Sequence, residues 1–314
     1  MKGPVSRNSF GRLKAQLSGF VCLPRVLVCR PAIPYHGVMH VPAFIKKYPV
    51  RSALGALATV LVILAGGFVT WALMAAPPSG LAMDALASDD AVDVRTGEWL
   101  TFSPKTGGTV RSAETSESTA RPLTGFIFYP GARVDFRAYA PLVREIAKGG
   151  YPSFLVSMPL NLAMFDIHAA DRIRAANPGI KRWVIAGHSL GGAMAAQYLA
   201  DSFSPAGNTS RVTASSLSGL ILLGAYSTSD LSAYDSLRVL SVSGSQDGLS
   251  TPAKIRANAK NLPGAARFLE IAGGNHAHFG NYGDQDGDLP ASIPPLAQRQ
   301  ASVAAILEFL DSLP

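Results

Sequence analysis

The sequence of 314 residues contains only two cysteines, Cys22 and Cys29, and both lie near its beginning. All later residues therefore lack the thiols needed for a disulfide framework, a cysteine nucleophile or a cysteine-ligated zinc site. Charged residues are also scarce, at 16% of the chain against about 25% in typical soluble domains. The first shortage excludes a disulfide-stabilised scaffold, and the second indicates that part of the chain does not face water.

Acidic residues are absent from residues 1–51, which hold nine of the 28 Lys and Arg residues. The rest of the chain has 19 basic and 21 acidic residues, so the excess positive charge belongs to the N-terminal arm. A nucleic-acid-binding domain needs a basic face on a folded region, and we therefore expect no nucleic-acid partner. We expect residues 1–51 to be a disordered cytoplasmic arm, unless the true start is Met39 instead of Met1.

Charge is missing altogether from residues 52–76, a mostly apolar run that ends at two prolines. About 20 apolar residues suffice to cross the hydrocarbon core of a membrane as a helix, so we expect one transmembrane helix that acts as a signal anchor. Lys46, Lys47 and Arg51 precede this run and acidic residues follow from Asp84, which predicts a cytoplasmic N-terminus and an extracytoplasmic C-terminal domain. The alternative is a cleaved signal peptide and secretion of the domain.

Beyond the apolar run, we expect a linker at residues 77–91 and one α/β domain at residues 92–314. Short apolar runs in this domain alternate with amphipathic helical patterns, which predicts a mostly parallel central sheet with helices on both faces. Strands are expected at residues 92–95, 99–103, 125–129, 153–157, 182–187, 219–225, 237–242 and 266–271. Helices are expected at residues 139–148, 165–176, 190–203, 252–261 and 300–313, and residues 104–122 should be a surface loop.

A G-x-S-x-G motif, Gly187-His188-Ser189-Leu190-Gly191, lies between a predicted strand and a predicted helix. This context is the one in which the motif forms a nucleophile elbow, a strained turn that lifts the serine Oγ above the sheet. Glycines are needed two residues to either side because side chains there would collide with neighbouring backbone. The motif predicts that Ser189 is a nucleophile.

A serine hydroxyl is a weak nucleophile and needs a general base held by a third group. In chains with this elbow, the carboxylate and then the histidine follow the serine. Asp247 directly follows the strand at residues 237–242 in a Gly-rich turn, at the edge where α/β sheets build their sites. We prefer it to Asp230 and Asp235, which lie in the preceding connection.

Two histidines follow the last predicted strand, His276 and His278. We prefer His276 as the base because it comes first after a Gly-Gly turn, and His278 then packs in the loop or contacts substrate. His188 is excluded as the base because it precedes the nucleophile, and its side chain should point away from Ser189 Oγ.

An oxyanion hole needs two backbone N–H groups aimed at the developing negative charge. One is expected from Leu190, which follows the nucleophile, and the other from the loop after the strand at residues 125–129. Ala132 is the preferred donor in that loop, and Arg133 is the alternative. The Arg133 side chain is also a candidate contact for an anionic substrate group, although a solvated arginine is the simpler interpretation.

From about Trp99 to its end, the chain resembles a family of largely uncharacterised bacterial α/β hydrolases related to dienelactone hydrolases and small carboxylesterases. The motifs that carry this resemblance lie at residues 128–131, 158–162, 183–194, 244–248 and 273–283. The resemblance implies the α/β-hydrolase fold and the Ser189, Asp247 and His276 triad, but no defined substrate. Ser189 stands where dienelactone hydrolases have cysteine, which disfavours their chemistry. The short connection between Tyr226 and Leu237 leaves no room for a cap domain.

The sequence gives little support for metal or cofactor binding. Asp284, Asp286 and Asp288 alternate as in a calcium loop, but Leu289 and Pro295 stand where an EF-hand needs Gly and Glu. We therefore expect a solvated acidic loop, no metal and no cofactor.

The expected activity is hydrolysis of an ester-like bond through an acyl-enzyme, in the manner of a carboxylesterase. The substrate is expected to be a small-molecule or envelope ester, reached from an open site at the membrane, and the oligomeric state stays open. Two alternatives share these features: an acyltransferase on the same fold, and a non-catalytic, membrane-tethered binding protein.

Overall fold

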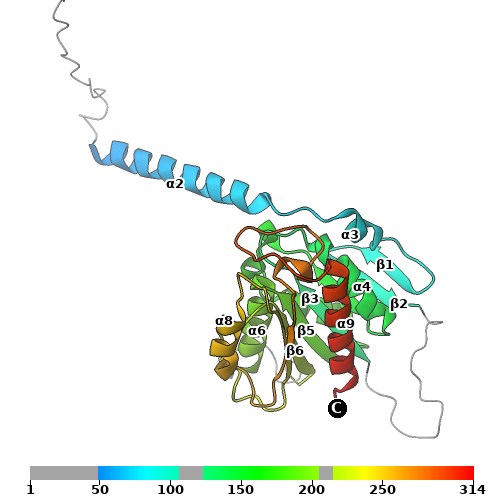
Figure 1. Ribbon diagram of the computed structural model, residues 1–314. Helices are drawn as coiled ribbons and strands as arrows, with labels where there is room; N and C mark the ends of the chain where they lie inside the picture. Colours follow the sequence, from blue (N-terminus) through cyan, green and yellow to red (C-terminus); the bar gives the residue numbers. More distant parts are fainter. Residues whose placement is uncertain (1–48, 106–122, 205–214) are drawn as a thin grey trace, which may run out of the picture. The chain divides into compact units, whose positions relative to one another are not determined.

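The computed structural model describes residues 49–105, 123–204 and 215–314 (Figure 1). The expected disordered arm lies almost wholly outside these residues, as does most of the predicted loop at residues 104–122. The chain divides into two compact units, residues 1–57 and residues 58–314, and the second unit contains the sheet and the candidate site.

Helix α2 spans Pro49–Leu73 and is the apolar helix expected from the sequence. It is long and apolar enough to cross a membrane. Almost all of its side chains are exposed, and Ala72 in its last turn is the exception that is fully buried. An apolar helix without a polar face is suited to a lipid environment.

The second unit contains an eight-stranded sheet in the order β1-β2-β4-β3-β5-β6-β7-β8. β1 and β2 run antiparallel at one edge, and the other six strands are parallel to one another. This mostly parallel sheet confirms the expected fold class. The strands are β1 (Val92–Thr96), β2 (Trp99–Pro104), β3 (Thr124–Tyr129), β4 (Ser153–Val156), β5 (Arg182–His188), β6 (Leu217–Leu223), β7 (Arg238–Gly244) and β8 (Arg267–Ile271).

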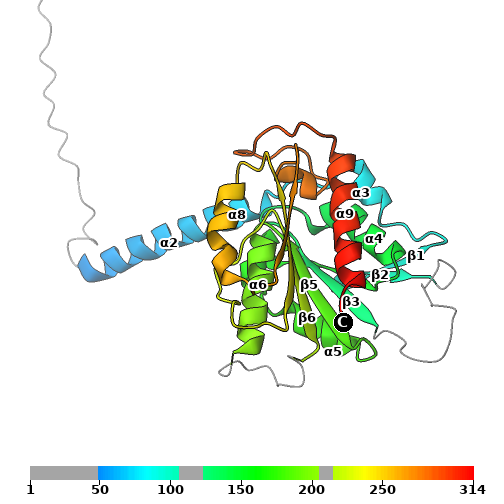
Figure 2. The ribbon, with the colours of Figure 1, turned by 60° about the horizontal axis from the view of Figure 1, so that its bottom comes forward.

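Helices cover both faces of the sheet (Figure 2). α4 (Ala140–Lys148) and α9 (Pro295–Asp311) pack on one face, and α5 (Ala169–Ala176) and α6 (Leu190–Phe203) pack on the other. Figure 2 shows α8 (Pro252–Asn258) on the same side as α6. Successive side chains of a strand point to opposite faces, so Phe126 and Phe128 of β3 join the first core and Ile127 and Tyr129 the second.

Residues 77–91, where the sequence predicted a linker, make contacts with α4. They contain helix α3 (Gly80–Asp84), capped by the Ser79 side chain, and Ala82 is fully buried. Arg144 of α4 donates to the carbonyls of Ala85 and Ala87 at 3.0 and 2.6 Å. Local composition does not reveal these contacts, because they come from a residue far along the chain.

Two short 3₁₀ helices, η2 (Pro159–Asn161) and η3 (Ala163–Phe165), connect β4 to α5. The predicted helix at residues 165–176 therefore begins later, at Ala169. Phe165 belongs to η3, where half of its surface is exposed.

Candidate active site

Ser189 lies in a strained turn between β5 and α6. Its backbone has φ 52° and ψ −123°, values that non-glycine residues rarely adopt and that cost about 1–3 kcal/mol. A Cβ on Gly187 would collide with the backbone of Gly191, and a Cβ on Gly191 would collide with the carbonyl of Tyr129. The two glycines therefore permit a turn this tight, as the motif predicted.

Asp247 and His276 meet at the carboxyl edge of the sheet. His276 Nδ1 lies 2.8 Å from Asp247 Oδ2, and the two residues are 0% and 1% exposed, respectively. The other carboxylate oxygen accepts the N–H groups of Leu249 and Ser250 at 2.9 and 2.6 Å. These bonds hold the carboxylate in one orientation, so it can fix the position of the imidazole.

The imidazole also lies beside the nucleophile turn. The rings of His188 and His276 are 4.4 Å apart between centroids. On the other side, Ser189 donates its N–H to the carbonyl of Leu223 at 3.0 Å. A Cβ on the next residue, Gly224, would lie only 3.0 Å from Asp247 Oδ2 and 3.1 Å from His276 Nδ1. His276 Nε2 is buried with no hydrogen-bond partner among the described residues, which leaves it free to take a proton from a hydroxyl.

The loop after β3 offers one uncommitted N–H group. Gly131 donates its N–H to Tyr139 Oη at 3.1 Å, and Arg133 donates its N–H to the carbonyl of Asn161 at 2.9 Å. The N–H of Ala132 has no acceptor within the described parts of the chain, nor does that of Leu190. These are the two groups predicted to form the oxyanion hole, and the alternative donor, Arg133, is already engaged.

A family model described as the alpha/beta hydrolase family matches residues 125–300. The chain belongs to this family. The matched residues include Ser189, Asp247, His276 and Ala132. The arrangement described above therefore lies within the region that matches the family model.

Solved structures similar to this hydrolase include two named esterases. One is a thermostable esterase from Pseudomonas putida, with 17% identity over 73% of this chain and 84% of that chain and a TM-score of 0.44. Another, from Thermogutta terrifontis, has 16% identity over 71% and 94% of the two chains and a TM-score of 0.43. TT1662 from Thermus thermophilus has 13% identity over 70% and 99%, with a TM-score of 0.45. No curated protein matches.

The two residues proposed to contact substrate have other partners in this hydrolase. The Arg133 guanidinium donates to the carbonyls of Trp71 and Met74, both at 3.1 Å, so an anionic substrate group would compete with these acceptors. His278 is half-buried, which lowers the pKa of its imidazole, and its backbone N–H bonds to Asn275. It makes no contact with Asp247 comparable to that of His276.

Sequence reasoning missed the part that Asp288 plays. Its Oδ1 accepts the N–H of Gly248 at 3.0 Å, and its Oδ2 accepts the N–H of Ala277 at 2.8 Å. One carboxylate thus ties together the two turns that carry Asp247 and His276. The exposed loop predicted for Asp284, Asp286 and Asp288 holds for the first two, but Asp288 is half-buried. Nothing in the local pattern distinguishes Asp288 from its neighbours.

Tyr139 and Gln298 also support the site from helices remote in sequence. Tyr139 Oη lies 2.8 Å from His188 Nδ1 and accepts the Gly131 N–H, so it links the loop after β3 to the turn that carries Ser189. Burial, and secondarily the neighbouring His276, holds the pKa of His188 well below its usual 6.5. His188 is therefore neutral. Gln298, fully buried in α9, bonds both the N–H and the carbonyl of Asn275.

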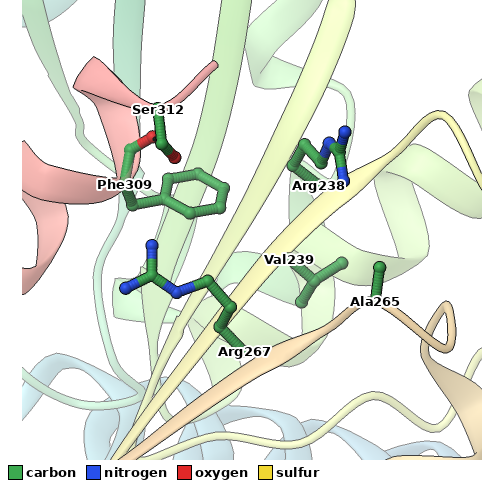
Figure 3. A pocket seen from close by; sticks show the side chains of 6 residues that line it. All are labelled: Arg238, Val239, Ala265, Arg267, Phe309 and Ser312. Carbon is green, nitrogen blue, oxygen red and sulfur yellow. Dashed lines mark hydrogen bonds between the residues drawn. The ribbon is translucent and has the colours of Figure 1, made fainter. Parts of the chain in front are cut away.

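A pocket at the opposite edge of the sheet has no part in this site (Figure 3). Arg238 and Arg267, the first residues of β7 and β8, line it together with Phe309. Arg267 pairs with Glu308 at 2.6 Å. The pocket therefore lies at the amino ends of the parallel strands, whereas ligands of open α/β sheets bind at the carboxyl ends.

Proposed function

We propose that this protein is a serine esterase attached to a membrane by α2. The observation that carries the proposal is the buried hydrogen bond of 2.8 Å between Asp247 and His276, at the sheet edge where Ser189 stands in its strained turn. A buried carboxylate that orients an imidazole beside a serine is the arrangement that makes a hydroxyl nucleophilic. Packing alone gives no reason for a buried ionisable pair whose carboxylate accepts two further hydrogen bonds.

The reaction follows from the positions of these groups. His276 Nε2 takes the proton of Ser189 as Oγ bonds to the acyl carbon, and the N–H groups of Ala132 and Leu190 stabilise the resulting oxyanion. His276 then gives this proton to the departing alcohol as the ester C–O bond breaks. His276 then takes a proton from water as the water oxygen bonds to the acyl carbon. The bond between the acyl carbon and Oγ breaks, His276 returns the proton to Oγ, and the acid leaves.

A site that is open to water favours hydrolysis of the acyl-enzyme over transfer of the acyl group to another acceptor. Residues 224–237, between β6 and β7, contain neither a helix nor a strand, so nothing folded covers the site from this connection. Water reaches an open acyl-enzyme easily, which supports an esterase. The orientation of the protein follows from the basic residues before α2 and the acidic residues after it, which favour an extracytoplasmic hydrolase domain.

Hydrolysis of p-nitrophenyl esters of increasing acyl length by the full-length protein tests the proposal. We expect Ser189→Ala and His276→Gln each to lower kcat by about 10⁴-fold or more, because the triad acts as a unit. His168→Gln is the matched control, since this histidine is half exposed at the start of α5, and it should retain full activity. Activity that survives in Ser189→Ala would refute the assignment.

Two further measurements separate the alternatives. Product analysis with added alcohols distinguishes an acyltransferase, which would form a new ester in place of the free acid. A reporter fused to the C-terminus tests the orientation, and a cytoplasmic reporter would contradict it. A protein that hydrolyses no ester and forms no acyl-enzyme would be the non-catalytic binding protein.

A further inference from the structure

The segment after α2 runs directly beside the candidate oxyanion loop. Ala76 donates its N–H to the carbonyl of Arg133 at 2.7 Å, and Asp135 donates its N–H to the carbonyl of Ala76 at 3.0 Å. Ala76 and Val134 thus form a parallel bridge. Because Ala132 immediately precedes this bridge, the end of the apolar helix is fastened next to a group proposed to bind the reacting carbonyl oxygen.

Side chains of the hydrolase domain also cap the end of α2. The last carbonyls of a helix have no partner within the helix, and here Arg133 binds those of Trp71 and Met74 while Asn161 Nδ2 binds that of Ala72 at 3.3 Å. The Arg133 guanidinium also lies 4.5 Å from the centroid of the Trp71 ring. A cation at a helix C-terminus interacts favourably with the helix dipole, so these contacts hold α2 against the domain.

The same loops carry backbone strain. Arg133, Leu160 and Asn161 have φ values of 55°, 53° and 54°, in the left-handed region that non-glycine residues avoid. Arg133 and Asn161 are joined by a backbone hydrogen bond of 2.9 Å. Strain of this kind persists where the surrounding structure imposes it, and it is concentrated at functional sites.

An apolar surface continues from α2 onto η3, which follows β4 at the carboxyl edge of the sheet. Met164 and Phe165 of η3 are 53% and 50% exposed, and the Phe165 ring packs edge-on against Phe68 of α2 at 6.2 Å. η3 packs against α6, the helix that starts directly after Ser189. Exposed apolar surface that adjoins a functional site marks a place where an apolar partner binds.

The length of α2 indicates which partner this is. Its 24 residues Val50–Leu73 span about 36 Å at 1.5 Å per residue, more than the hydrocarbon core of about 30 Å. A helix that crosses the membrane therefore brings its last turn to the membrane interface. Arg133 and Asn161, which bind the carbonyls at this end of α2, then lie at the lipid surface, and Phe165 lies close by against Phe68 in the preceding turn.

We propose that the mouth of the active site faces the bilayer and that Met164 and Phe165 guide the acyl chain of a membrane lipid ester to Ser189. This inference rests on the proposed esterase function and names its substrate class. The ester would enter from the lipid surface with its acyl chain along η3 and its carbonyl toward Ala132. The reaction itself is the one described above, and its products are a fatty acid and an alcohol.

The test compares two substrates with the full-length protein in phosphatidylcholine vesicles. p-Nitrophenyl palmitate dissolved in the vesicles reports on the lipid route, and water-soluble p-nitrophenyl acetate reports on the chemistry. We expect Phe165→Asp to lower the palmitate-to-acetate ratio of kcat/KM by about tenfold, the effect of losing contact with one aromatic side chain. Met164→Asp should also lower the palmitate-to-acetate ratio. Phe268→Asp is the matched control, because Phe268 is also 50% exposed but lies on the edge strand β8.

The outcomes separate this inference from the function on which it rests. An unchanged ratio in both η3 variants, with acetate hydrolysis intact, would overturn the lipid route and leave the esterase standing. A wild-type protein that hydrolyses neither ester would contradict the proposed function and the inference together. If Phe165→Asp instead converts a dimer to a monomer in light scattering and leaves the ratio unchanged, the surface joins two copies of the chain, and the lipid route is wrong.

Discussion

Single residues outside the proposed triad fix the positions of the turns that carry the triad residues. Asp288 is the clearest example, because its two carboxylate oxygens bind one N–H group each from the turns that bear Asp247 and His276. Hydrogen bonds donated to a charged acceptor are about twice as strong as those between neutral groups, so this side chain couples the two turns. It touches neither substrate nor the reacting atoms and is therefore a positioning residue.

Asp288→Asn tests this coupling. The amide presents only one acceptor oxygen, so the N–H of either Gly248 or Ala277 loses its partner. The distance between Asp247 and His276 is then less tightly fixed. We expect kcat on p-nitrophenyl acetate to fall by roughly 10- to 100-fold with KM little changed. Asp286→Asn, in the exposed part of the same loop, is the control. Equal kcat values in the two variants would show that Asp288 has no such role.

Tyr139→Phe tests the link between the oxyanion loop and the nucleophile turn. Without the hydroxyl, the buried Gly131 N–H and His188 Nδ1 both lose their partner, which costs about 1–3 kcal/mol for each buried group left unsatisfied. We expect a clear drop in the unfolding midpoint in detergent and a lower kcat. Tyr151→Phe removes a more exposed bond to Asp311 and should cost less; a reversed order would contradict the structure.

The buried imidazole of His188 predicts how stability depends on pH. Burial depresses its pKa in the folded state below the usual 6.5. The stability that the neutral imidazole contributes to the folded state is therefore fully present above pH 6.5. As the pH falls below that value, this histidine binds a proton in the unfolded chain but not in the folded chain. The free energy of unfolding therefore decreases by up to about 1.4 kcal/mol per pH unit. His278, with a pKa lowered in the same direction, adds to this loss.

Unfolding midpoints in detergent at about pH 7.5 and about pH 5.5, on either side of the histidine range, measure the effect. His188→Gln removes the titrating group, so its midpoint should decrease less between the two pH values than that of the unaltered protein. Equal decreases in both proteins would mean that His188 takes up its proton in the folded state.

At the scale of elements, Arg144 connects α4 to the segment at residues 77–91. It is 7% exposed, donates to two carbonyls of this segment, and pairs with Asp89 at 2.5 Å. The bond from Arg144, with further backbone bonds, holds the pKa of Asp89 well below its usual value. The segment between α2 and the hydrolase domain is therefore packed onto the domain.

Arg144→Met tests this attachment because it keeps much of the side-chain volume but removes every donor. We expect faster proteolytic cleavage within residues 77–91 and a loss of about 2–4 kcal/mol in unfolding free energy, as for other buried charged donors whose partners are left behind. Lys148→Met, which removes an exposed pair with Glu145, should change neither. A cleavage rate unchanged by Arg144→Met would indicate that other contacts hold the segment.

At the scale of the whole molecule, the sequence predicted the sheet, its helices on both faces and the apolar helix. These features follow from periodicity and from long apolar runs, which are local properties of the chain. The same holds for the turn at Ser189, since the glycines that permit it are its near neighbours. The packing of α3 and the late start of α5 were missed, because they depend on tertiary contacts that outweigh local propensity.

The supporting residues of the site show the same limit. Asp288, Tyr139, Gln298 and Asn161 each bind backbone groups of a loop that is remote in sequence or in a different element. No short motif encodes such pairs, so a single sequence cannot single them out. Arg133 is a further residue whose contacts the sequence did not reveal. It was a candidate substrate contact, but its guanidinium binds carbonyls at the end of α2.

The most direct test of the central claim is to locate the adduct of a fluorophosphonate probe by mass spectrometry. Such a probe phosphonylates an activated serine hydroxyl, with loss of fluoride, and ignores ordinary serines. We expect one adduct, on the peptide that contains Ser189, absent in Ser189→Ala and formed much more slowly in Asp247→Asn. A protein that forms no adduct, or carries it on another serine, would contradict the claim that Ser189, His276 and Asp247 act together.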